Sequence, residues 1–494
     1  MPLNKGLRAT RVNCGITNYT MKIKTSINGI TFLLLALVAA CSSPSHNGEQ
    51  PKNAIAVTIT SGDKKFQLSS GQPLTFDNDS IKGPIIEVDT SHKFQSIDGF
   101  GYTLTGGSAY LLRQKLTDEQ RSALLKELFS TDGNGIGVSY LRISVGASDL
   151  DDEVFSYDDL EKGETDPTLA NFSLAPDDEN LIPVLREILS IAPDIKIMGS
   201  PWSAPSWMKT NNSTKGGSLR VEYYDVYSRY LVKYIQEMAK RGITIDAITL
   251  QNEPENPHNN PSMVMTADEQ TKFVGSFIGP AFTAFGINTK IVVFDHNCDH
   301  PEYPISILNN ARAKRYTNGT AFHLYLGDIS ALSMVHDAHP DRNIYFTEQW
   351  TSGKGEFGGD LNWHVKNLIV GATRNWSRTV LEWNLANDPQ FNPHTDDGGC
   401  TECLGAITIG DSVVRNVSYY IIAQASKSVR PGSTRIGSTD LSELPNVAFV
   451  NPSGKKVLIV LNEAAEAKTF GISFFKQTAT ATLPPGSVGT FVWD

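Results

Sequence analysis

The sequence has few cysteines, no excess of basic residues and no long hydrophobic segment, and each shortage excludes a class of protein. Five cysteines in 494 residues are too few for a disulfide-scaffolded domain. The 43 lysines and arginines are outnumbered by 53 acidic residues and form no cluster, so we expect no nucleic-acid partner. No apolar run approaches the about 20 residues of a membrane-spanning helix. No glycine-rich phosphate loop follows a predicted strand, so nucleotide chemistry has no support.

The composition that remains is globular, with 40% hydrophobic and 19% charged residues, so disorder as the main state is excluded. A chain of this length can bury a large core. It is expected to form several domains, or one large barrel with an accessory domain.

The N-terminal region has the features of an export signal. Two lysines precede a short apolar run at 30–40, which ends in small residues directly before Cys41. This pattern resembles a bacterial lipobox and predicts lipidation of Cys41, with a polar tether over 41–53. The expected location is the bacterial cell envelope, in the periplasm or on the outer-membrane surface, with membrane contact only through the lipid anchor. The alternative is a plain signal peptide followed by a chance cysteine.

The rest of the chain changes pattern twice. Short strands with turn signals cover 54–95, alternating strands and helices cover 96–426, and strands return over 427–494. Helices are predicted at 117–129, 179–192 and 222–241. The eight strands predicted in the middle part are 96–105, 139–146, 195–203, 245–254, 290–297, 320–327, 343–350 and 379–386.

Eight strand–helix units predict an α/β fold, a (β/α)8 TIM barrel with a side β-sandwich built from N- and C-terminal strands. Neither flanking β segment is long enough to form a comfortable sandwich alone, so we expect them to combine. The predicted organisation is an upstream region and signal peptide over 1–40, a tether over 41–53, sandwich strands over 54–95, a catalytic barrel over 96–426 and sandwich strands over 427–494.

Two glutamates follow apolar runs at strand ends of the predicted barrel. Glu253 ends the fourth strand and Glu348 the seventh, and barrel enzymes place functional side chains at these ends. Cleavage of a glycosidic bond needs such a pair, one acid for the leaving oxygen and one carboxylate to attack or to activate water. Solvated glutamates without a catalytic role are an equal alternative from these residues alone.

Further polar and aromatic residues occupy the same strand ends. Aromatic rings stack on sugars, but the tryptophans, including Trp207, could equally pack in the core. Arg142 could be a buried ion-pair partner, for which Glu348 is the obvious acid, and His323 could orient a neighbour rather than act directly. The candidate substrate-binding residues are Arg142, Asp149, Trp202, Asn252, His323, Tyr325 and Trp383.

The cysteines and histidines predict no metal or cofactor. Cys400 and Cys403 form a C-x-x-C pair, for which a redox pair and a metal half-site are alternatives, but a disulfide after the eighth strand is favoured in an exported protein. Cys298 is then an odd, buried thiol. His296 and His300 are expected in one loop without a third ligand at fixed spacing.

Seven motifs together resemble glycoside hydrolase family 30, the glucosylceramidase-like retaining β-glycosidases, and the resemblance runs from about residue 95 to 494. Seven motifs in this order are highly specific. They are IDGFGYTLTGGSA (97–109), LRISVGASD (141–149), GSPWSAPSWMKTN (199–211), LQNEP (250–254), FHLYLGD (322–328), FTEQW (346–350) and EWNLA (382–386).

The resemblance implies a role for each matching residue. Glu253 resembles the general acid/base and Glu348 the nucleophile. Asn252 matches the contact to the sugar 2-hydroxyl, Arg142 the arginine that holds the nucleophile, and Asp149 the acid at the far edge of the glucose ring. The aromatic positions of the first sugar site are matched by Trp202, Tyr325 and Trp383.

Two departures from the animal glucosylceramidases indicate a different substrate. Leu324 replaces a tryptophan on strand six, and the loop 388–403 carries Gly-Gly-Cys-x-x-Cys, which resembles a microbial branch that includes endo-β-1,6-glucanases. The expected activity is therefore that of an endo-β-1,6-glucanase, which hydrolyses a β-linked glucan. The alternatives are a glucosylceramidase-type exo-β-glucosidase and, more remotely, a non-catalytic glycan-binding protein on the cell surface.

The expected mechanism is double displacement with retention, with carboxyl groups about 5–5.5 Å apart. Burial and nearby negative charge should raise the pKa of Glu253, while Arg142 should keep Glu348 ionised.

Overall fold

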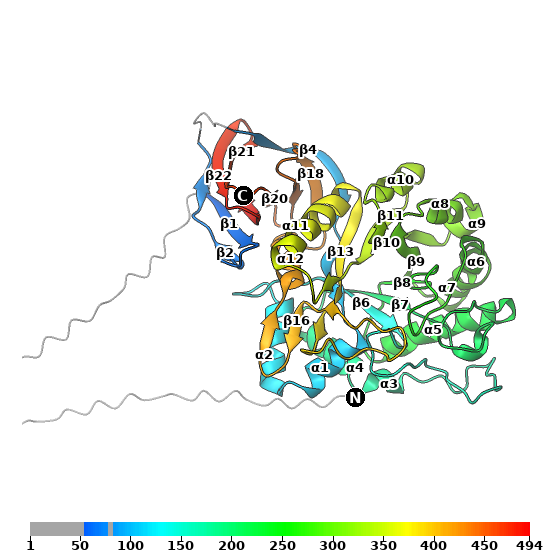
Figure 1. Ribbon diagram of the computed structural model, residues 1–494. Helices are drawn as coiled ribbons and strands as arrows, with labels where there is room; N and C mark the ends of the chain where they lie inside the picture. The colour runs from blue at the N-terminus through cyan, green and yellow to red at the C-terminus, as the bar shows by residue number, and fades with distance from the viewer. Residues whose placement is uncertain (1–53, 78–82) are drawn as a thin grey trace, which may run out of the picture. The chain divides into compact units, whose positions relative to one another are not determined.

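The computed structural model describes residues 54–77 and 83–494 (Figure 1). The predicted signal peptide, Cys41 and the tether lie outside these residues. Eight parallel strands form a closed barrel in chain order, and all eight predicted strands are present. They are β5 (Gly99–Thr103), β6 (Tyr140–Val145), β7 (Lys196–Pro201), β8 (Ala247–Thr249), β9 (Lys290–Cys298), β10 (Thr317–Gly327), β11 (Asn343–Glu348) and β13 (Ser377–Asn384).

Helices surround the barrel and bury its outer surface, which explains why most barrel strands are buried along nearly their whole length. The three predicted helices appear as α2 (Asp118–Phe129), α4 (Leu181–Ile191) and α5 (Tyr224–Lys240). A capping box on Thr117 and Gln120 fixes the start of α2. Further helices are α1 (Gly106–Gln114), α8 (Glu302–Asn309), α11 (Phe357–His364) and α12 (Val417–Ser426). Within the described residues, no helix has the length and apolar character needed to cross a membrane.

The barrel interior is filled in layers. An apolar cluster of one residue from each of seven strands closes the N-terminal end. Side chains two positions further along a strand face the same side, so they form the next layer toward the C-terminal mouth. The apolar cluster comprises Tyr140, Met198, Ala247, Val292, Ala321, Tyr345 and Leu381. The next layer includes the buried polar residues Arg142, Ser200, Thr249, His323 and Thr347.

The N-terminal strands complete the C-terminal β-structure, as predicted. β1 (Ala54–Ser61) pairs with β23 (Ser487–Trp493), and β4 (Ile85–Ser96) pairs with β18 (Thr434–Ser438) and β21 (Lys468–Phe474). Neither segment therefore leaves its apolar face exposed. The remaining long strands of this ten-stranded sheet are β19 (Asn446–Val450), β20 (Lys456–Asn462) and β22 (Gln477–Leu483).

Strand β20 shows how the sandwich joins the barrel. Its apolar run is buried on both faces, which is why the sequence shows no alternation there. Val457, Ile459 and Leu461 belong to the large core that includes the barrel helices, whereas Leu458 and Val460 belong to the core between the sandwich layers. The turn Asn451–Gly454 connects β19 to β20 in an antiparallel hairpin.

Candidate active site

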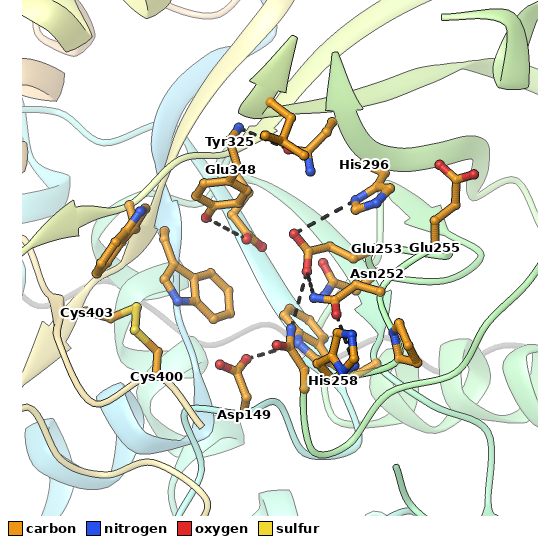
Figure 2. A pocket seen from close by; sticks show the side chains of 18 residues that line it. Asp149, Asn252, Glu253, Glu255, His258, His296, Tyr325, Glu348, Cys400 and Cys403 are labelled. Atoms are coloured by element: carbon orange, nitrogen blue, oxygen red, sulfur yellow. Dashed lines mark hydrogen bonds and ion pairs between the residues drawn. A yellow bond between two sulfur atoms is a disulfide. The ribbon is translucent and has the colours of Figure 1, made fainter. Parts of the chain in front are cut away.

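The two glutamates lie at the C-terminal mouth of the barrel, where the strand ends predicted them. Glu348 is the last residue of β11, and Glu253 follows β8 in a left-handed conformation with φ 46°. Both are buried and line one cavity of about 510 Å³. Figure 2 shows their carboxylates pointing toward one another across this cavity. The other sequence-predicted residues that line it are Asp149, Trp202, Asn252, Tyr325, Trp383, Cys400 and Cys403.

Arg142 lies beneath the cavity floor and organises it. Its guanidinium is fully buried and donates to Glu348 Oε2 at 2.5 Å, to Asp295 Oδ2 at 2.8 Å and to Asn252 Oδ1 at 2.6 Å. A buried guanidinium needs such partners, because an unpaired charge is costly in the interior. The arrangement fixes Asn252 and Glu348 relative to each other.

Asp295 is a second fixed point that the sequence analysis did not identify. Its Oδ2 accepts hydrogen bonds from Arg142, Ser200 and Thr249, and its Oδ1 from Thr347 and from a ring nitrogen of His323 at 3.2 Å. Burial raises the pKa of Asp295, but the Arg142 and His323 charges hold it well below its usual range. Asp295 is therefore a permanent negative charge under the site.

His323 connects the two glutamates. Its Nδ1 lies 3.3 Å from Glu253 Oε1 and 3.6 Å from Glu348 Oε1. Burial lowers the pKa of His323, but Glu348, Asp295 and Glu253 raise it to about 9. The imidazole therefore carries a positive charge between the carboxylates at neutral pH, and it is both an orienting group and a neighbour of the reacting atoms.

Glu253 differs from expectation in its protonation. Burial raises its pKa, but His323 and His296, together with a hydrogen bond from Asn256 Nδ2 to Oε2 at 2.7 Å, lower it to about 2. Asn259 Nδ2 also donates to Oε2, at 3.3 Å. The expectation of a raised pKa is wrong because the adjacent imidazole outweighs burial. Glu253 and His323 behave as a coupled pair that holds one proton at neutral pH.

Glu348 has a pKa that is shifted in the opposite direction, upward. Burial raises its pKa and Glu253 adds to this, while His323 and Arg142 oppose the shift without cancelling it. Tyr325 donates its hydroxyl to Glu348 Oε1 at 2.9 Å, so both oxygens have a donor. The geometric expectation for Arg142 is met, but its electrostatic effect is smaller than the desolvation of the carboxylate.

Trp202 and Trp383 form one aromatic wall. Their rings stack with centroids 5.4 Å apart, and the Arg142 guanidinium lies 4.7 Å from the Trp202 ring centroid. Trp202 Nε1 donates to Asp149 Oδ1 at 3.1 Å, and burial with the nearby Glu348 raises the pKa of Asp149 to about 7. Trp207 instead donates to the Asp158 carbonyl and packs in the core, which decides between its two interpretations.

Two loops meet at the rim of the cavity. Cys400 and Cys403 are joined by a disulfide in the loop after β13, and Cys298 is a buried free thiol. This loop contacts the one after β8, where Thr395 Oγ1 donates to the Asn260 carbonyl at 2.8 Å. The disulfide therefore stiffens a segment that borders the cavity.

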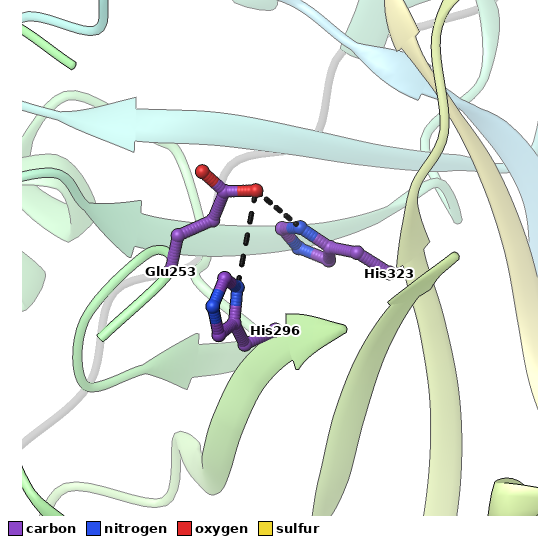
Figure 3. Close-up of side chains that lie close together, drawn as sticks. All are labelled: Glu253, His296 and His323. Carbon is purple, nitrogen blue, oxygen red and sulfur yellow. Dashed lines mark hydrogen bonds and ion pairs between the residues drawn. The ribbon is translucent and has the colours of Figure 1, made fainter. Parts of the chain in front are cut away.

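Three residues next to Glu253 were not predicted, because no fixed spacing in the sequence links them to the catalytic motifs. His296 lies within β9 and not in a loop with His300, so the loop prediction is wrong. Glu253, His296 and His323 come close enough to share one metal ion, although they belong to different parts of the chain (Figure 3). Asn256 and Asn259 follow the LQNEP motif closely, a signal that could have identified them.

A closed (β/α)8 barrel with two buried glutamates facing one another at its mouth defines an O-glycosyl hydrolase. Two family models match the chain: the glycosyl hydrolase family 30 TIM-barrel domain over 97–429 and the family 30 beta sandwich domain over 432–491. The chain belongs to glycosyl hydrolase family 30, as the seven motifs predicted.

Similar proteins include endo-1,6-beta-D-glucanases and glucosylceramidases. The chain is 35% identical to an endo-1,6-beta-D-glucanase of Neurospora crassa over 430 residues, covering 82% of this chain and 87% of that protein. It is 26% identical to the lysosomal acid glucosylceramidase of Mus musculus over 460 residues, 87% of each chain. A solved endo-beta1,6-glucanase superposes with a TM-score of 0.83 at 32% identity, covering 89% of this chain and 99% of that one.

Proposed function

We propose that this protein cleaves β-1,6-linked glucan internally, as an endo-β-1,6-glucanase. The observation that carries this proposal is the polar wall beside Glu253. Glu255, Asn256, His258 and Asn259 line the cavity directly after the glutamate whose proton goes to the leaving group. Such side chains can hydrogen-bond a sugar leaving group, whereas a lipid leaving group would require apolar contacts. The similarity to the two glucanases over most of both chains supports the same substrate.

In the first step, Glu348 attacks the anomeric carbon while Glu253 protonates the leaving oxygen. Arg142 holds Glu348 Oε2, so we assign Oε1, beside Tyr325, as the attacking atom. Asn252 accepts from Arg142 through Oδ1, which orients its amide nitrogen for the sugar 2-hydroxyl. The bond from the anomeric carbon to the leaving oxygen breaks as the bond to Glu348 forms.

In the second step, Glu253 removes a proton from water, and that water attacks the glycosyl-enzyme at the anomeric carbon. Two inversions give overall retention. Trp202, Trp383 and Asp149 surround the sugar site in this proposal, the rings by stacking and Asp149 by hydrogen bonds to hydroxyls. Proton NMR of the first product would test it: the β-anomer is expected, and an α-anomer would reject double displacement.

The substrate is tested by product analysis. The protein is incubated with β-1,6-glucan, β-1,3-glucan, β-xylan and glucosylceramide, with Glu348→Gln as the inactive control. Oligosaccharides from β-1,6-glucan alone are expected. Glucose and ceramide from glucosylceramide would instead select the exo-β-glucosidase, and glucose as the sole early product from glucan would reject internal cleavage.

Azide rescue assigns the two glutamates without reference to their pKa values. In Glu253→Ala with an aryl β-gentiobioside, azide attacks the glycosyl-enzyme without base assistance and yields a β-glycosyl azide. In Glu348→Ala, azide replaces the missing nucleophile and yields the α-azide. The opposite pair of products would reverse the assignment.

We also propose that the mature protein is an exported lipoprotein anchored through Cys41, followed by the tether 41–53. The support is the basic, apolar and small-residue order that precedes the cysteine. Palmitate labelling of the native chain in a bacterial host should mark the wild type but not Cys41→Ser. Equal labelling of both would reject the anchor. The proposed boundaries of the folded parts remain 54–95, 96–426 and 427–494.

A further inference from the structure

Three side chains from consecutive parts of the barrel surround a small space beside the cavity (Figure 3). Glu253, His296 and His323 are all buried, and one ligand atom from each lies within 4.8 Å of the other two. We propose that these residues bind a divalent transition-metal ion, Zn²⁺ in the first instance, and that the bound ion reversibly inhibits the enzyme. The sequence contains no spaced metal motif because the fold alone brings the three together.

His296 is the residue that the hydrolytic mechanism does not use. Its Nδ1 is buried, has no hydrogen-bond partner among residues 54–77 and 83–494, and lies 3.9 Å from Glu253 Oε1. An unpaired polar atom in the interior is costly unless it has a ligand. His296 also lines the cavity, so an ion can reach it from solvent.

His323 is held as histidine ligands of metals usually are. One ring nitrogen, Nε2, faces Asp295 Oδ1 at 3.2 Å, and the other, Nδ1, faces Glu253. A carboxylate behind a histidine fixes the ring orientation and increases the basicity of the nitrogen that binds the metal. Asp295 is itself fixed by Arg142, Ser200, Thr249 and Thr347, so this support is rigid.

Tetrahedral coordination requires the three ligand atoms, which lie within 4.8 Å of one another, to move together by up to about 1.4 Å. Zinc bonds of about 2.0–2.1 Å place neighbouring ligand atoms about 3.4 Å apart. The Glu253 Oε1 to His323 Nδ1 distance is already 3.3 Å, and the His296 Nδ1 distance of 3.9 Å must shorten by about 0.5 Å. Two histidines and one glutamate leave a fourth position open to the cavity for water, as in zinc sites with three protein ligands.

Charge and ligand chemistry favour a zinc-like ion. Glu348 and Asp149 line the same cavity and Asp295 lies below, while Arg142 already pairs with Glu348 and Asp295. The His323 proton leaves when the imidazole binds the ion, so the dication enters an anionic environment. Two imidazole nitrogens select Zn²⁺ and its neighbours over Mg²⁺ or Ca²⁺, which prefer oxygen ligands. A bound ion occupies Glu253 Oε1 and competes with the proton that the acid/base step requires.

The experiment measures zinc binding and activity separately, on the purified full-length protein freed of metal. Zinc chloride is titrated calorimetrically into the wild type, His296→Gln and the matched control His300→Gln. His300 is an exposed histidine near the end of β9 that pairs with Glu255. We expect one zinc per chain for the wild type and His300→Gln, and at least about a tenfold weaker affinity for His296→Gln. Circular dichroism checks that each variant is folded.

Activity on an aryl β-gentiobioside should fall with zinc over the same concentration range and return with EDTA, each variant being compared with its own metal-free rate. Glu253→Gln serves as a second ligand variant in the calorimetry, should His296→Gln fail to fold. No zinc binding, or unchanged affinity in the folded ligand variants, would overturn the site. Binding without inhibition would overturn its effect on catalysis. An inactive wild-type protein would contradict the proposed function. The calorimetry would still decide whether the zinc site exists, because it needs no substrate.

Discussion

The buried charge of Asp295 allows a quantitative prediction. In Asp295→Asn, the carboxylate between Arg142 and His323 becomes a neutral amide. The NH2 group of this amide replaces one carboxylate oxygen and faces donors whose hydrogen bonds that oxygen accepted. Removing one partner from a buried ion pair costs about 3–5 kcal/mol, because the other charge stays buried without compensation. We expect the free energy of unfolding to fall by that amount near neutral pH. Activity should fall as well, since Asp295 orients both Arg142 and His323.

The stability difference between the wild type and Asp295→Asn should depend on pH in a defined direction. The folded-state pKa of Asp295 lies below its unfolded value, so its contribution is complete above the unfolded pKa of about 3.9 and is lost as the pH falls. The stability difference between the wild type and Asp295→Asn should therefore be largest near pH 7 and shrink below about pH 4. Guanidinium unfolding, followed by tryptophan fluorescence and circular dichroism at several pH values, measures this difference.

Asp151 provides a matched control, because it is also buried and has no cationic partner in the part of the chain that the structure describes. It accepts hydrogen bonds from the backbone N–H and the hydroxyl of Ser148, and burial raises its pKa to about 6. An asparagine oxygen can accept the same bonds, so Asp151→Asn should be neutral or stabilising above about pH 6. If Asp295→Asn is as stable as Asp151→Asn at neutral pH, or if its deficit does not change with pH, the electrostatic reasoning is refuted.

Two further predictions concern the walls of the cavity. Asn256→Ala removes a hydrogen bond worth about 1.5–3 kcal/mol to the Glu253 carboxylate. The pKa of Glu253 should therefore rise by about 1–2 units, which a carbon-13 NMR titration of its carboxyl group measures. An unchanged or lower pKa would contradict this. Replacing Cys400 and Cys403 together by alanine should cost at most about 2 kcal/mol, because the bridge closes a very short loop. The replacement should raise KM, and an unaltered KM would show that the bridge does not shape the site.

Most of the fold could be predicted because local patterns and global topology agree. The strands of the barrel are short apolar runs separated by amphipathic helices, and their order along the chain is their order around the barrel. Barrel enzymes carry functional side chains at the C-terminal ends of their strands, so the strand assignment placed Glu253 and Glu348 at one mouth of the barrel. The sandwich was predictable because neither flanking β segment is long enough to bury its own apolar face, so the two had to combine.

Asp295 could not be predicted in the same way. Side chains alternate along a regular strand, so Val292 and Phe294 should share a face and Asp295 should point the other way. In β9, Phe294 and Asp295 have φ values of 73° and 70°, and the pairing with β10 shifts register there. This bulge turns Asp295 into the polar layer. A left-handed pair of non-glycine residues is not visible in a single sequence.

The pKa of Glu253 was predicted wrongly because the expectation considered burial and the two carboxylates without the imidazole between them. His323 was treated as one of several strand-end residues, yet its Nδ1 reaches both glutamates. The direction of a pKa shift depends on the balance between burial and the charges a few ångströms away, and strand assignment does not give distances of 3 to 4 Å.

The shared proton has a consequence for the proposed mechanism. With Arg142 and His323 charged and Glu253, Glu348 and Asp295 ionised, the group carries one net negative charge. Moving the proton from His323 to Glu253 leaves that total unchanged, so the acid step needs no proton from solvent. Once Glu253 has given the proton to the leaving oxygen and Glu348 has become an ester, the net charge is again one negative. Glu253 is then ionised beside a neutral imidazole, which is the state that a base needs to deprotonate water in the second step.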